Sequence, residues 1–159
     1  MLNIKRSLLI SLLLLPKLSF AAGEVLTVVQ DINFGETVPR AGSCVMDVIT
    51  GDITPANLCV SDGILGIYTI TATANTNIEI KAISTVGDVN GFILEPTLRL
   101  TNNLGDEVTN LNPDTYIDFS TGSDGLITVY MAGTLTFPGG SAAGSTQTLT
   151  AKLEFTEAP

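Results

Sequence analysis

Short runs of alternating apolar and polar residues make up most of this sequence, and Gly, Asn, Asp and Pro separate them about every ten residues. The clearest run is 148–155, where every second residue is apolar. A period of two places successive side chains on opposite faces of a strand, and no segment keeps the 3.6-residue period of a helix. The chain is therefore predicted to be all-β, and the buried face of its closing strand is Leu149, Ala151, Leu153 and Phe155.

A first strand is predicted to end at Gly35, with Gln30 as the one polar residue on its inward face. Residues 68–72 and 78–82 also alternate. The turn signal at residues 75–77 predicts that these two runs pair as an antiparallel hairpin. The inward face of the first strand is Leu26, Val28, Ile32 and Phe34.

Further strands are predicted in the second half of the chain. Residues 92–100 carry one apolar face, in which Pro96 marks an edge or a bulge. Residues 126–137 are apolar on both sides, which is typical of a strand buried between neighbours. With weaker candidates at 44–50 and 115–119, the expected total is roughly eight to ten strands, as in a β-sandwich or barrel.

Residues 1–21 have the features of a secretory signal peptide. Lys5 and Arg6 precede an apolar core, and small residues precede the expected cleavage site. The core is broken at Pro16, short of the ~18 apolar residues that a membrane span needs. We therefore expect residues 22–159 to form one exported domain without a membrane span.

Composition narrows the function classes. The chain has no His, so Ser-His-Asp and Cys-His nucleophile systems and imidazole metal ligands are excluded. We expect no enzymatic activity, no catalytic residue, no metal site and no cofactor. The oxygen-bearing side chains of residues 118–125 are predicted to form a solvated turn rather than a calcium loop. A net charge of −9 disfavours nucleic acid as a partner.

Cys44 and Cys59 are predicted to form a disulfide, because export would place both in an oxidising compartment. Their spacing is far from the Cys-x-x-Cys of redox and metal sites. A bridge of this span would remove about 3 kcal/mol of unfolded-state entropy in the chain-entropy model.

Two parts of the chain resemble a known family. Asp31-Ile32-Asn33-Phe34-Gly35 is similar to the "DLxFG" strand end of spore-coat-protein-U-like and related pilin-like domains of Gram-negative bacteria. Residues 133–138, 142–145 and 149–155 are similar to that family's penultimate strand, "AAGxY" turn and closing strand.

The resemblance implies an immunoglobulin-like, pilin-like antiparallel β-sandwich, exported to the periplasm by way of a signal peptide. It implies a structural subunit of a cell-surface fimbria or pilus, escorted by a periplasmic chaperone and assembled through an outer-membrane usher. In that family each subunit lacks one strand, and a neighbouring subunit fills the apolar groove with its N-terminal segment by β-strand exchange.

The sequence leaves the role of residues 22–34 open. One alternative is that these residues are a donor strand and that the core begins later. A second is that the subunit receives a strand without giving one. A third is that residues 22–34 pair within their own chain and complete the sandwich. The competing function is a self-complete surface or adhesive domain that does not polymerise, with carbohydrate as its candidate ligand. Neither the ligand nor the position of the subunit in a fibre is indicated.

Overall fold

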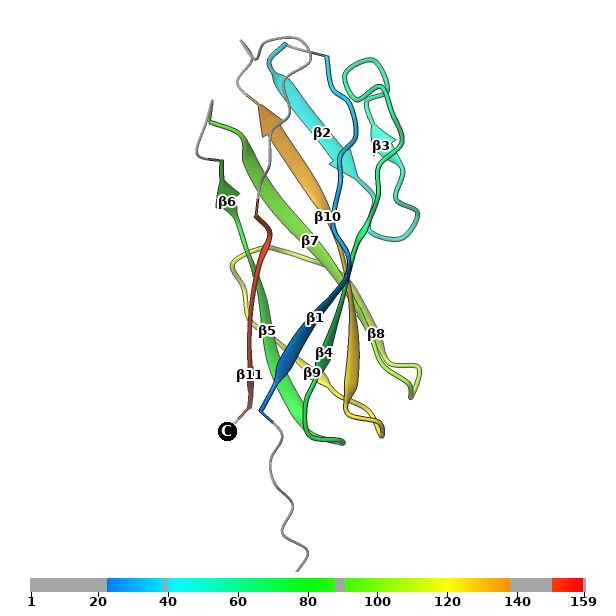
Figure 1. Cartoon of the computed structure of the whole chain (residues 1–159), viewed down its shortest axis with the longest axis vertical. Helices are drawn as coiled ribbons and strands as arrows, with labels where there is room; N and C mark the ends of the chain where they lie inside the picture. The colour runs from blue at the N-terminus through cyan, green and yellow to red at the C-terminus, as the bar shows by residue number, and fades with distance from the viewer. Residues whose placement is uncertain (1–22, 39, 88–90, 138–149, 159) are drawn as a thin grey trace, which may run out of the picture.

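The computed structural model describes residues 23–38, 40–87, 91–137 and 150–158, which form eleven β-strands and no helix (Figure 1). All pairings are antiparallel, so the all-β prediction is confirmed. The predicted signal peptide lies outside the described residues. In chain order the strands are β1 (Val25–Gln30), β2 (Gly42–Met46), β3 (Ile53–Thr54), β4 (Gly66–Thr71), β5 (Asn77–Ile83), β6 (Thr85–Val86), β7 (Ile93–Thr101), β8 (Glu107–Leu111), β9 (Ile117–Ser120), β10 (Leu126–Phe137) and β11 (Lys152–Glu157).

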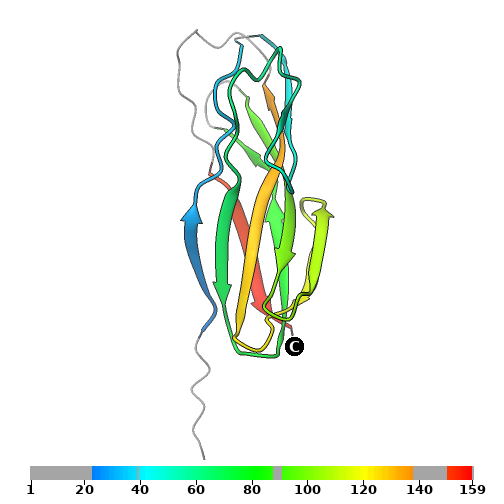
Figure 2. The same ribbon diagram turned by 90° about the vertical axis from the view of Figure 1, so that its right-hand side faces the viewer.

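The strands form two sheets that pack against each other. The larger has eight strands, and its order β1-β4-β10-β2-β3 is extended by β7, which pairs with β10, β6 and β8. The smaller has the order β11-β5-β9. The strands run roughly along the long axis of the molecule (Figure 2). Strand β1 is one edge of the larger sheet, and β11 is one edge of the smaller.

The core consists of two buried clusters. The first lies between them, where Ile70 and Leu100 of the larger sheet contact the layer of Ile78 and Ile80 from the smaller. The second surrounds the disulfide and includes Phe137 at the other end of β10. Strand β10 contributes to both clusters. Its predicted place between neighbouring strands is confirmed, whereas the prediction that both of its faces are buried holds for one face only, since Thr128 and Tyr130 are half-buried.

Strand β10 changes its neighbour at Gly133. Residues 126–131 pair with β4, and residues 133–137 pair with β2 on the same side. Gly133 has φ +136°, and a Cβ there would meet the backbone carbonyl of Glu95 in β7. Glycine is therefore required for β10 to lie this close to β7 while it passes from one partner to the next.

Pro96 lies within β7 opposite Gly133. On its other side β7 pairs with β6 at residues 93–94 and with β8 at residues 98–101, so Pro96 occupies the interval between them. The prediction of a local edge at Pro96 is confirmed, because among the described residues no strand pairs with β7 at this position and the N–H that proline lacks is not needed.

The predicted hairpin of residues 68–72 and 78–82 is wrong. Strand β4 pairs with β1 and β10, whereas β5 pairs with β9 and β11, so the chain crosses between sheets after Thr71. The crossing is fixed by buried Thr121, whose hydroxyl donates to the carbonyl of Thr73 and accepts from the N–H of Thr76. The alternation alone does not distinguish a hairpin within one sheet from a connection between two facing sheets.

Candidate functional site

The inward faces of β1 and β11 are incompletely covered, and the region between these two sheet edges is called the seam below. Leu26 lies opposite buried Ile70, and Val28 lies opposite buried Tyr68, so both β1 side chains face the interior. Val28 is nevertheless 54% exposed. An inward-facing apolar side chain with this exposure marks a part of the sandwich that nothing in the described chain covers.

The inward-facing side chains of β11 are also incompletely covered. Leu153 lies opposite Ala82, and Phe155 lies opposite Ile80, both of which are buried. Leu153 and Phe155 pack on the cluster between the sheets but are only half-buried, as is Ala151 just before the strand. Three of the four residues predicted for the closing-strand groove face are thus at the seam, and Leu149 lies outside the described residues.

The backbone of β11 also has an unpaired side at the seam. The N–H of Ala158 donates to the carbonyl of Asn77 in β5, so alternate residues 154 and 156 face β5 as well. The backbone groups of Leu153 and Phe155 therefore point toward the seam, where no described residue pairs with them. An edge of this kind can accept an additional extended strand.

On its other side β11 is held firmly to β5. Lys81 forms a 2.7 Å ion pair with Glu154 and lies 4.3 Å from the ring centre of Tyr116, whose hydroxyl donates to the same carboxylate. The hydrogen bonds from Lys81 and Tyr116 lower the pKa of Glu154, and the bond to Glu154 raises the pKa of Lys81. Strand β11 is thus anchored along one edge and open along the other.

The predicted first-strand face is divided between two regions. Strand β1 ends at Gln30, after an irregular register at Val28. Leu26 and the half-buried Ile32 pack on the cluster between the sheets, whereas Phe34 is buried beside the disulfide. The prediction that these residues share one strand face is wrong, because the break at Gln30 separates Phe34 from Leu26 and Val28.

Residues 25–30 pair with β4 of their own chain. Burial raises the pKa of the Tyr68 phenol beneath β1, and the carboxylate of Asp31 raises it further, so this core hydroxyl stays neutral. Five of the six residues of β1 are exposed, and Val25, Val28 and Val29 are each more than half exposed. Strand β1 is therefore attached along one edge and buries little surface.

The disulfide between Cys44 and Cys59 is present, as predicted, with a Cα–Cα distance of 6.1 Å. Both half-cystines are buried. The bridge indicates an oxidising environment outside the cytoplasm.

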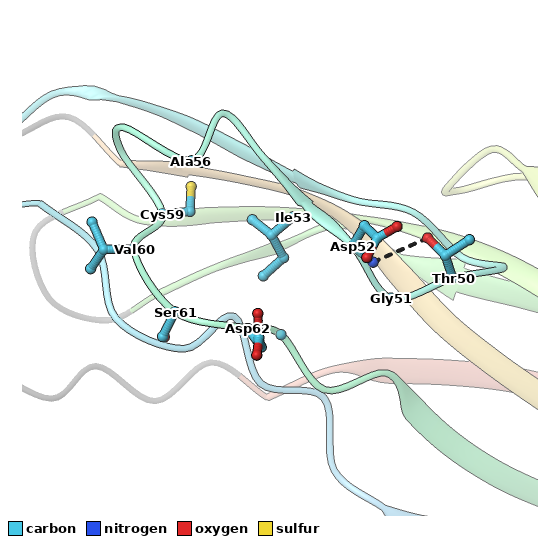
Figure 3. Close-up of a pocket in the computed structure, with 10 residues that line it drawn as sticks. Thr50, Gly51, Asp52, Ile53, Ala56, Cys59, Val60, Ser61 and Asp62 are labelled. Carbon is cyan, nitrogen blue, oxygen red and sulfur yellow. Dashed lines mark hydrogen bonds between the residues drawn. The ribbon is translucent and has the colours of Figure 1, made fainter.

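An open pocket of about 510 Å³ lies beside the disulfide (Figure 3). Its lining includes Cys59 and the carboxylates of Asp52 and Asp62. It offers hydrogen-bonding groups, among them the hydroxyls of Thr50 and Ser61, and its half-cystine Cys59 is held in the disulfide. Within the described ranges, no group of three or more His, Cys, Asp or Glu residues is placed to hold a metal ion.

Asp47 holds the turn that leads into this pocket. Its Oδ1 accepts hydrogen bonds from the N–H groups of Thr50 and Ile49, which lower the pKa of the carboxyl below its ordinary value of 3.8. These hydrogen bonds therefore stabilise the folded state above about pH 4, and this stabilisation is lost as the pH falls through the lowered folded-state pKa of Asp47. We expect the Ile49 and Thr50 amide resonances to shift together on acidification in NMR spectra, and Asp47→Ala to lack this transition. A transition that persists in Asp47→Ala would assign it to another group.

Comparison of the chain with protein-family models, with curated proteins and with solved structures finds no match. In the described part of the chain, no helix has the length and hydropathy of a membrane span. The seam is therefore the feature on which a function can be argued.

Proposed function

We propose that this protein is a non-enzymatic structural subunit of a bacterial fimbria or related surface fibre, which assembles by exchange of β1 between copies. In this proposal the sandwich is immunoglobulin-like and pilin-like, as the sequence motifs imply, and the chain is exported through the periplasm with a chaperone and an usher as partners. The occupant of the β4 edge is β1 of the same chain in the monomer and β1 of a second copy in the fibre.

The observation that carries the proposal is the contrast between β1 and its site. The site is apolar, since Tyr68 and Ile70 of β4 are buried in the cluster between the sheets, against which Leu153 and Phe155 of β11 also pack. Strand β1 itself is mostly exposed, and β4 is the one described strand with which it pairs. Backbone pairing gives an exchanged strand its affinity, and alternate side chains give it register.

Exchange in trans can be detected by pairing cysteines across β1 and β4. Thr27 of β1 is paired directly with Thr69 of β4. The Cα–Cα distance between directly paired residues of antiparallel strands is within the range that a disulfide needs. We expect Thr27→Cys and Thr69→Cys chains of different size, refolded together as residues 22–159, to give a covalent heterodimer on a non-reducing gel.

The matched control uses Thr101→Cys in place of Thr69→Cys. Thr101 is in the same cross-strand row but on β7, beyond both β4 and β10. The Thr27→Cys and Thr101→Cys mixture should give no specific heterodimer. Equal yields in both mixtures, or a chain that stays monomeric without any trans bridge, would contradict exchange of β1 and favour a self-complete surface or adhesive domain.

A further inference from the structure

Glu24 lies one residue before β1 and reaches the end of β11. Its Oε1 accepts a hydrogen bond from the backbone N–H of Glu157. The Oε1 of Glu157 in turn accepts a 3.2 Å hydrogen bond from the N–H of Thr73, in the connection from β4 to β5. Both glutamates are half-buried. These two carboxylates join β1, β11 and the connection between the sheets at one end of the seam.

The amide that Glu24 binds has a particular place on β11. Leu153, Phe155 and Glu157 alternate along the strand, and their backbone N–H groups point away from β5. The carboxylate of Glu24 thus lies where a carbonyl oxygen of an added strand would otherwise accept a hydrogen bond. Inward-pointing charged side chains are one means by which sheet edges are protected from unwanted pairing.

We propose that Glu24 is a latch that holds β1 in its own chain and closes the end of the β11 edge. Within the described ranges β1 has one neighbouring strand, so the hydrogen bond from Glu157 to Glu24 ties the N-terminal end of β1 to the smaller sheet. A hydrogen bond that involves a carboxylate is stronger than a neutral one and loses strength when the charge is removed. The regulatory part of the inference, that opening the latch promotes exchange, rests on the proposed function.

Amide hydrogen exchange of the full exported chain tests the latch without any assembly. We expect Glu24→Ala to accelerate exchange of the first amides of β1 at least about tenfold, which corresponds to ~1.4 kcal/mol and to the loss of one charge-assisted bond. Glu24→Gln keeps an acceptor oxygen and should give a smaller increase. Glu107→Ala removes an equal charge from the exposed start of β8 and should leave these amides unchanged.

The Thr27→Cys and Thr69→Cys mixture then tests the consequence for exchange. We expect the heterodimer to form faster when both chains carry Glu24→Ala than when both carry Glu107→Ala. Unchanged β1 amides in Glu24→Ala would overturn the latch even if the heterodimer forms. Accelerated amides with no heterodimer in any background would support the latch and overturn its coupling to assembly, together with the proposed function.

Discussion

Replacement of Gly133 by Ala is expected to destabilise the protein by more than about 3 kcal/mol, a large part of the ~5 to 15 kcal/mol of an ordinary domain. Two costs add at this position. The φ of +136° is one that a residue with a Cβ rarely adopts, and the new Cβ would meet the carbonyl of Glu95 and the backbone of Pro96. Since both obstacles are backbone atoms of β7, a side-chain rotation cannot relieve them. Urea unfolding followed by far-UV circular dichroism measures the loss.

Gly105→Ala separates the two costs. Gly105 also has a left-handed conformation, with φ +87°, but nothing lies within 4 Å of the position of its missing Cβ. We expect its loss to be confined to the conformational cost, about 1 kcal/mol. If Gly133→Ala is no more destabilising than Gly105→Ala, the close approach of β10 to β7 is not what requires glycine.

Removal of the disulfide is expected to cost about 3 kcal/mol, because the bridge joins residues separated by 15 positions and restricts the unfolded chain. The double variant Cys44→Ala with Cys59→Ala is preferable to serine, since both positions are buried and a hydroxyl there would need a partner. Unfolding in urea should show a lower midpoint than in the parent protein.

Reduction of the parent protein provides an independent comparison. Reduced parent and double variant should unfold at similar urea concentrations, because both lack the covalent constraint. A double variant as stable as the oxidised parent would show that the packing of residues around Cys44 and Cys59, rather than the bridge, holds this end of the sandwich.

The sequence was most informative for long strands that have at least one buried face. The bounds of β10 coincide with the predicted run of residues 126–137. One face of the strand, with Ile127 and Val129, is buried, and the other, with Thr128 and Tyr130, is half-buried. The disulfide also follows from the sequence, because the chain contains only two cysteines. The short strands β3 and β6 were missed, as two residues cannot show a period.

The seam could be predicted in part. The alternation placed Leu153 and Phe155 on an inward face, and the structure keeps them there. The tie between Glu24 and Glu157 could not be predicted, since the residues are separated by 133 positions and two acidic side chains give no local sign of a shared hydrogen bond. The prediction that residues 68–72 and 78–82 form a hairpin was wrong for a related reason, because the local pattern of apolar residues does not reveal which sheet a strand will join.

The change of neighbour along β10 has a consequence for how the two parts of the core are connected. Its first half belongs to the cluster between the sheets, through Ile127 and Val129, and its second half to the cluster around the disulfide, through Leu135 and Phe137. The two clusters therefore use different halves of one uninterrupted strand, which meet at Gly133. The two ends of this elongated sandwich are thereby joined by a single continuous backbone.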